Sequence, residues 1–79
     1  MTLYFFDVFD GEAILRDDAG VDLPTEQDAA NHAAAALPEM AHDELPNGPQ
    51  RSFWVKVRDG SGDYFFMADL KFKQTWLKR

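Results

Sequence analysis

The fold is decided by residues 3–9, which read LYFFDVF. Four aromatic residues and a valine within seven positions are typical of a β-strand. Successive side chains of a strand point to opposite faces. The two faces carry Tyr4, Phe6 and Val8 on one side and Leu3, Phe5, Asp7 and Phe9 on the other. Because both faces are largely apolar, the sequence predicts a central strand that is covered twice.

A hairpin is expected directly after this strand. Asp10 and Gly11 form a turn signal between two apolar runs. Residues 13–17 read as a short second strand, and residues 18–20 close it with another turn. The segment that follows extends toward Pro24, which disfavours helix in the residue before it.

A helix is predicted to begin after Thr25, a good N-cap residue, with Asp28 in the acidic part of a capping box. Pro38 removes one helical hydrogen bond and is expected to kink the helix. A break at Pro38, with a second short helix beginning there, is the alternative. The turn at residues 46–49 ends the helical region. The apolar stripe consists of Ala30, Ala33, Ala34, Leu37, Ala41 and Leu45, with Met40 at its margin.

Two further strands are expected in the last third of the chain. Residues 51–58 alternate between apolar and polar, residues 59–62 form a turn, and residues 64–72 make the last strand. The tail, residues 73–79, carries Trp76 and Leu77 among cations. It is expected to dock as a short turn of helix, and folding of this tail over part of the sheet is the alternative to an exposed sheet face.

These elements predict one small α+β domain over residues 1–79, a ββαββ two-layer sandwich with one Pro-kinked helix on one face of a four-stranded, mainly antiparallel sheet. Numbered along the chain, the strands are expected in the order 2-1-3-4, which makes residues 3–9 central. The order 2-1-4-3 is the runner-up.

Composition restricts the possible functions. The chain has 79 residues and no cysteine, so disulfides and thiolate zinc sites are excluded. So short a chain forms a marginal core, which burial of its eleven aromatic residues is expected to strengthen, with oligomerisation supplying the rest. Residues 1–50 carry one cation and eleven acids, whereas residues 51–79 carry seven cations and three acids, within a net charge of −6. A globally acidic chain argues against nucleic-acid binding, which depends on neutralising phosphates. Without a signal-peptide pattern or a long apolar run, a soluble, cytoplasmic protein with no membrane partner is expected.

No catalytic, cofactor-binding or metal site is visible, and no small-molecule ligand is predicted. His32 and Glu39 lie seven residues apart on the expected helix, roughly 10 Å, which is too far for one ion. The turn from Asp59 to Asp63 begins like a calcium loop but lacks the glycine and glutamate that such a loop needs later. The chain has no cysteine nucleophile, and no serine or threonine adjoins a histidine in sequence. The protein is therefore not expected to be an enzyme.

Several motifs together resemble a known family. They are YFFDV at residues 4–8, Asp10-Gly11, Asp17 with Gly20, and Leu23-Pro24 before the helical Ala29-Ala30. The chain is similar to short bacterial domains of unknown function, common in alphaproteobacteria, that open with Y-F-F-H-V or a close variant. The family often has His at the position of Asp7, and Pro38 departs from its usual helix. The resemblance implies an independent small domain with no established activity.

The candidate functional surface is the sheet face turned away from the helix. One helix covers only one face, and an apolar patch left on the other usually marks an interaction site. Asp7 is expected to pair with Lys56 or Arg58 across this face. The predicted partner is a second copy in a homodimer, or another protein; single-stranded nucleic acid is the alternative. The candidate residues are Leu3, Phe5, Phe9, Trp54, Lys56, Arg58, Phe65 and Met67.

Overall fold

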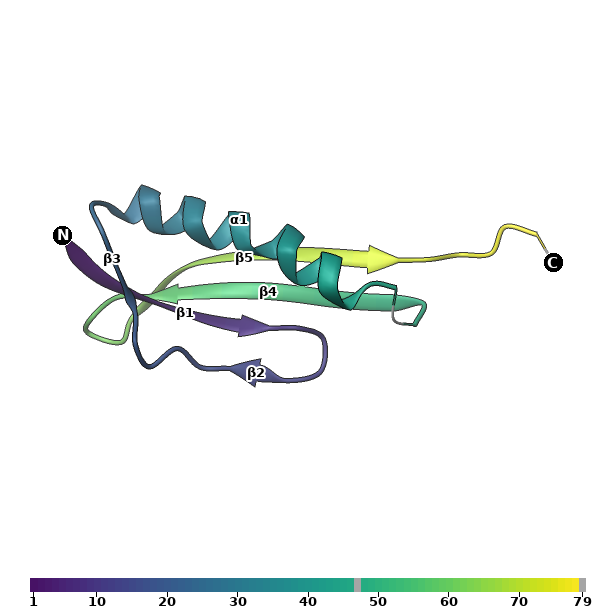
Figure 1. Ribbon diagram of the computed structural model, residues 1–79, viewed down its shortest axis with the longest axis horizontal. Coiled ribbons are helices and arrows are strands. Elements are labelled where there is room, and N and C mark those ends of the chain that lie inside the picture. Colours follow the sequence, from purple (N-terminus) through teal and green to yellow (C-terminus); the bar gives the residue numbers. More distant parts are fainter. Residues whose placement is uncertain (47, 79) are drawn as a thin grey trace.

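The computed structural model describes residues 1–46 and 48–78, so Asn47 of the expected turn and Arg79 of the expected tail lie outside the described residues. One helix packs on one side of an antiparallel sheet, as the α+β prediction requires (Figure 1). In chain order the elements are β1 (Thr2–Phe9), β2 (Ile14–Leu15), β3 (Val21–Leu23), α1 (Glu26–Glu44), β4 (Gln50–Arg58) and β5 (Tyr64–Lys73).

Strand β1 lies inside the sheet, with β4 along one side and both β2 and β3 along the other. The main path is β2-β1-β4-β5, and the runner-up order is wrong because β5 pairs with β4 rather than with β1. The expected four-stranded sheet is also incomplete. Strand β3 adds a fifth strand, since Val21–Leu23 pairs with the first residues of β1. The edge beside β1 is thus shared by two short strands, and residues 16–20 separate them.

Helix α1 begins as the sequence predicts. The Thr25 side chain accepts a hydrogen bond from the backbone N–H of Asp28, and Glu26 and Asp28 lie in the first turn. The expectation of a kink or break at Pro38 is wrong, because one uninterrupted helix runs through this residue to Glu44. The buried side chains of Leu37 and Ala41 flank Pro38 on the same face, so packing holds the helix in phase where one hydrogen bond is lost.

The core lies between α1 and the middle of the sheet. The helix contributes a narrow stripe at intervals of four residues, Ala29, Ala33, Leu37 and Ala41, and β4 contributes Phe53, Val55 and Val57. The stripe begins at the fully buried Ala29 rather than at Ala30, which is half-buried. Ala34, which was expected within the stripe, is exposed. Alanine at these positions lets the helix backbone approach the larger side chains of the sheet. Tyr4 of β1 is buried in the same core, as its strand face predicts.

The helix is not centred on the sheet. It packs mainly against β4 and β5 and meets β3 near its own start. On the β2 side, Phe6 and Val8 are only partly buried, and the Phe6 ring contacts the exposed His32 ring at a centroid distance of 4.7 Å. The helix side of the sheet therefore has an uncovered margin next to β2.

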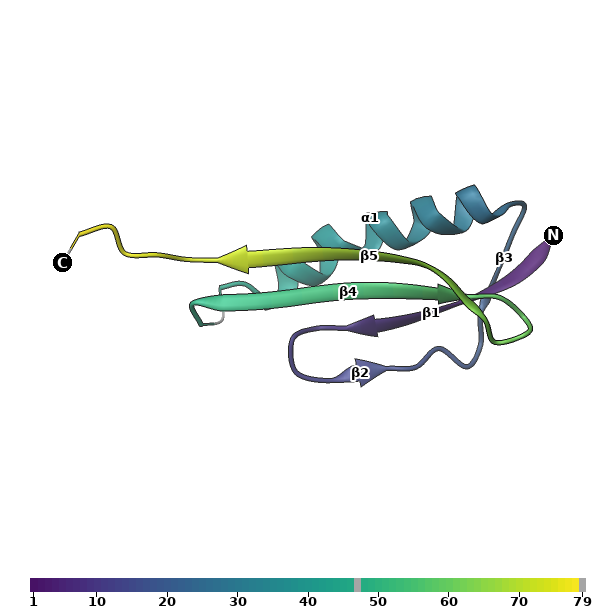
Figure 2. The ribbon, with the colours of Figure 1, turned by 180° about the vertical axis from the view of Figure 1, so that it is seen from behind.

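The end of the chain departs from the expected tail. Residues 74–78 form no helical turn; they continue the direction of β5 and leave the body of the molecule (Figures 1 and 2). Trp76 and Leu77 are 94% and 95% exposed. The domain measures 54 × 21 × 19 Å, and this arm forms one end of its long axis. The arm covers no part of the sheet, so the expected docked turn of helix is wrong, and so is the alternative in which the tail folds over the sheet.

Candidate interaction surface

Seen from behind, the sheet turns its helix-free face to the viewer, and no helix or strand of the described chain lies over it (Figure 2). The register between β1 and β4 places Phe5 opposite Arg58 and Phe9 opposite Trp54. Met67 of β5 lies opposite Lys56. Directly opposed residues of paired strands share a face. The predicted set therefore does meet on one face, with one exception.

The exception is Phe65, which lies on the helix side. The β4–β5 pairing shifts between Val57 and Arg58, so that Arg58 pairs with Tyr64 and Phe65 has no direct partner. Such a bulge re-aims the extra residue. The Phe65 ring packs 5.7 Å from that of the buried Tyr4, next to the core. Tyr64 takes the place expected for Phe65, and simple alternation along β5 could not reveal this.

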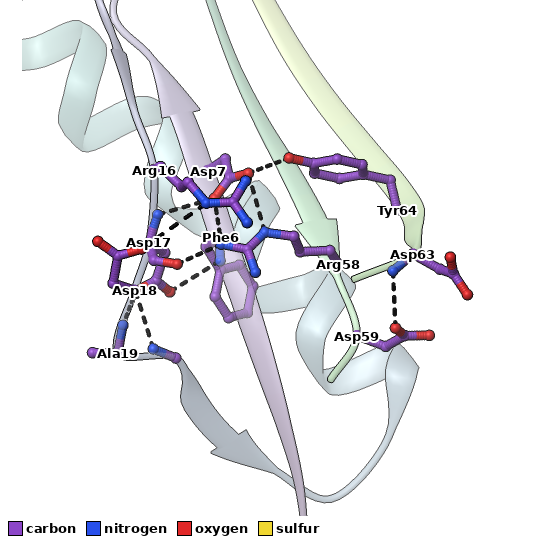
Figure 3. Close-up of polar contacts among 11 residues, drawn as sticks. Phe6, Asp7, Arg16, Asp17, Asp18, Ala19, Arg58, Asp59, Asp63 and Tyr64 are labelled. Carbon is purple, nitrogen blue, oxygen red and sulfur yellow. Dashed lines mark hydrogen bonds and ion pairs between the residues drawn. The ribbon is translucent and has the colours of Figure 1, made fainter. Parts of the chain in front are cut away.

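Asp7 and Arg58 form a buried ion pair on this face, with exposures of 4% and 7%. The Arg58 Nε and Nη2 atoms donate to the two Asp7 carboxylate oxygens at 3.3 Å each (Figure 3). The Tyr64 hydroxyl donates to the same carboxylate, and the backbone N–H of Asp17 donates to it at 3.0 Å. The expected pairing of Asp7 is thus made with Arg58. Lys56, directly opposite Asp7 in the register, instead places its ammonium near the rings of its aromatic neighbours.

The loop of residues 16–20 is fastened to β1 by Asp17. Its carboxylate accepts hydrogen bonds from the backbone N–H groups of Phe6, Ala19 and Gly20, each at 3.0 Å (Figure 3). Gly20 has φ of +77°, and a Cβ built there would lie 3.0 Å from the side chains of Leu3 and Phe5. The loop therefore covers the end of the face that those two side chains occupy.

These contacts also set the protonation of the network. Burial by itself would raise the pKa of Asp7, but hydrogen bonds from Tyr64, the Asp17 backbone and Arg58 hold it below its usual value of 3.8. Burial likewise opposes ionisation of Asp17, and three backbone N–H donors lower its pKa. The Asp7 side chain raises the pKa of Arg58. All three groups are charged at neutral pH and satisfied by one another, as expected for a structural network.

The other half of the face stays open. Phe9 and Trp54 stack with ring centroids 5.5 Å apart, and the Lys56 ammonium lies 4.9 Å from the Trp54 ring centroid. Ile14, which pairs with Phe9, is 64% exposed, and Met67 is 51% exposed. We call Phe9, Ile14, Trp54 and Met67 the open patch. Ile14 was not among the predicted surface residues. A two-residue turn at Asp10-Gly11 would pair Phe9 with Glu12, whereas the observed connection spans residues 10–13 and pairs Phe9 with Ile14.

Outside this face the described residues offer little chemistry. No group of three or more His, Asp or Glu side chains within residues 1–46 and 48–78 could hold a metal ion. In the same part of the chain, no helix is long and apolar enough to cross a membrane. Arg51, the other buried cation, donates to Glu44 Oε1 and to the Asp10 carbonyl, both at 2.8 Å. It therefore ties the end of α1 and the first hairpin to β4.

A comparison with known protein families gives a match over almost the whole domain. Residues 3–71, which run from the start of β1 almost to the end of β5, match the model of a family described as a domain of unknown function, DUF6894. No curated protein and no solved structure gives a significant match. The matched segment includes the whole ion-pair network and the open patch, and it stops before the arm. The chain therefore belongs to the DUF6894 family of domains of unknown function.

Proposed function

We propose that this domain is a protein-interaction module that self-associates through the sheet face opposite the helix. The observation that carries the proposal is the open patch, where a stacked aromatic pair and two exposed side chains, Ile14 and Met67, share the half of the face that the loop of residues 16–20 leaves open. Single exposed apolar residues are ordinary, but a contiguous group on an uncovered sheet marks an interaction site. The proposed function is binding rather than catalysis, since the buried charged groups of this face, Asp7, Asp17 and Arg58, are bound to one another.

Charge at the patch favours a second copy as the partner. Lys56 and Lys71 lie on the same face as Asp69, which is opposite Trp54 in the register. A two-fold interface brings each surface against itself, so a surface with both charges beside an apolar centre is self-complementary. Two such faces can place the lysines of one copy near Asp69 of the other, around the paired aromatic rings.

The direct test is the oligomeric state at micromolar concentration, measured by light scattering after size exclusion. Burial of an Ile or Met side chain contributes about 1.5–3 kcal/mol. Ile14→Asp or Met67→Asp should therefore raise the dissociation constant about tenfold or more. Ala35→Asp adds the same charge at an exposed helix position and is the matched control. A monomeric parent protein, or a dimer that tolerates both patch variants, refutes the proposal.

Single-stranded nucleic acid is the second candidate, because Lys56 beside the stacked Phe9 and Trp54 resembles a platform for bases. The net charge of −6 opposes it. Fluorescence anisotropy with a labelled oligonucleotide at low salt decides between the two. Salt-sensitive binding that Trp54→Ala removes would favour nucleic acid, and no binding would leave self-association. A bacterial, cytoplasmic setting, favoured by the opening motif and the absence of cysteine, is part of the proposal.

A further inference from the structure

A second apolar surface lies on the helix side of the sheet, where α1 leaves the margin next to β2 uncovered. A groove of about 430 Å³ runs there between Phe6, Val8 and Leu15, with residues 16–19 (Arg16, Asp17, Asp18 and Ala19) along its rim. Leu15 is 70% exposed. Because Leu15 and Ile14 are neighbours on one strand, they point to opposite faces, and this groove is separate from the open patch.

The arm of residues 74–78 has the complementary character. It is extended, and its Trp76 and Leu77 are almost fully exposed. Lysines stand on both sides of this pair, at positions 73 and 78, and residues 70–78 contain no acid. An aromatic side chain of this size removes ~150–250 Å² from water when it is buried. The chain thus presents a basic, apolar segment that its own fold leaves in solvent.

We propose that the arm of one copy docks in the groove of a second copy, with Trp76 and Leu77 against Phe6, Val8 and Leu15. The basic arm meets a rim that carries two acids, Asp17 and Asp18, and one cation, Arg16, in a half of the chain (residues 1–50) that has eleven acids and no other cation. The Asp18 side chain is 91% exposed, and Arg16 Nε lies 3.9 Å from its Oδ1. The groove of the same copy is poorly placed for its own arm. It lies at the β2 edge, three strand spacings or roughly 14 Å from β5, while the arm runs away along the strand axis (Figure 1).

This inference does not depend on the proposed function, because groove and open patch lie on opposite sides of the sheet. Reciprocal exchange of two arms gives a closed dimer in which each copy supplies one arm and one groove. The arm lies beyond the family match at residues 3–71, so this contact concerns a segment that the family model does not include.

The absence of cysteine allows a clean cross-linking test. Thr75→Cys on the arm and Ala19→Cys on the groove rim are made in separate chains, mixed and oxidised, so any mixed disulfide is intermolecular. Gly60→Cys, in the open turn between β4 and β5, replaces Ala19→Cys as the matched control. We expect a several-fold excess of the Thr75→Cys/Ala19→Cys product by mass spectrometry. Equal yields with Ala19→Cys and Gly60→Cys overturn the proposal.

Second substitutions identify the surface responsible. Leu15→Asp in the Ala19→Cys chain, or Trp76→Ser in the Thr75→Cys chain, should remove the excess, and both positions are exposed enough for the fold to tolerate the change. Met67→Asp, on the open patch, should leave the excess in place even where it weakens association through that face. An excess that survives Leu15→Asp and disappears with Met67→Asp assigns the contact to the opposite face and overturns the proposal.

Discussion

Replacing Asp7 by Asn tests the buried network most directly, because the side chain keeps its shape and loses its charge. The carboxylate accepts from Arg58 twice, from the Tyr64 hydroxyl and from the Asp17 backbone. An amide turns one of its two acceptor atoms into a donor, so about two of these four contacts are lost. A hydrogen bond to a charged group contributes about 1.5–3 kcal/mol, and breaking a buried ion pair costs ~3–5 kcal/mol.

We therefore expect Asp7→Asn to lower the free energy of unfolding by about 3 kcal/mol at pH 7. For a domain of this size, that corresponds to a fall in Tm of roughly 12–24 °C. Urea unfolding followed by tryptophan fluorescence measures the difference. Tyr64→Phe, which removes one donor and leaves the ion pair, is the graded comparison and should cost about 1 kcal/mol.

The contribution of Asp7 to the free energy of unfolding should depend on pH. The pKa of Asp7 in the folded state lies below 3.8, so its ionised form stabilises the fold above that pH. This contribution is lost as the pH falls from 3.8 through the lower, folded-state pKa. The difference between the parent protein and Asp7→Asn should therefore shrink in acid. A difference under about 0.5 kcal/mol at pH 7, or one that stays constant down to pH ~2, refutes the reasoning.

Three further substitutions probe the rest of the fold by the same unfolding measurement. Arg51→Met leaves Glu44 and the Asp10 carbonyl without their donor and should cost about 2 kcal/mol, whereas Glu12→Gln, at 4.0 Å and largely exposed, should change little. Gly20→Ala puts a Cβ on a residue with a left-handed backbone, against the side chains of Leu3 and Phe5, and should cost ~1–2 kcal/mol. Gly60→Ala, where a Cβ meets nothing, is its neutral control. Pro38→Ala restores a helical N–H and should stabilise the domain by up to ~3 kcal/mol; an unchanged midpoint would contradict the account of the helix.

Local signals along the chain predicted most of the elements and the side chains that face the helix. The two apolar faces of residues 3–9 indicated a central strand, and β1 does have strands on both sides. Thr25 and Asp28 marked the start of the helix. These features depend on neighbours within a few residues, through the two-residue period of a strand and the capping of a helix, so the sequence expresses them directly.

Other features depended on pairing between distant segments. The bulge opposite Arg58 moved Phe65 to the helix side, and the short β3 pairs with the start of β1. Tertiary packing also placed α1 toward β5 and opened the groove beside Leu15. The network of Asp7, Asp17, Arg58 and Tyr64 joins four segments up to 57 residues apart. The sequence by itself determined which side chains of each strand share a face. Only the tertiary structure decided which of them meet across strands, because the strand register and the position of the helix on the sheet follow from the packing of the whole core.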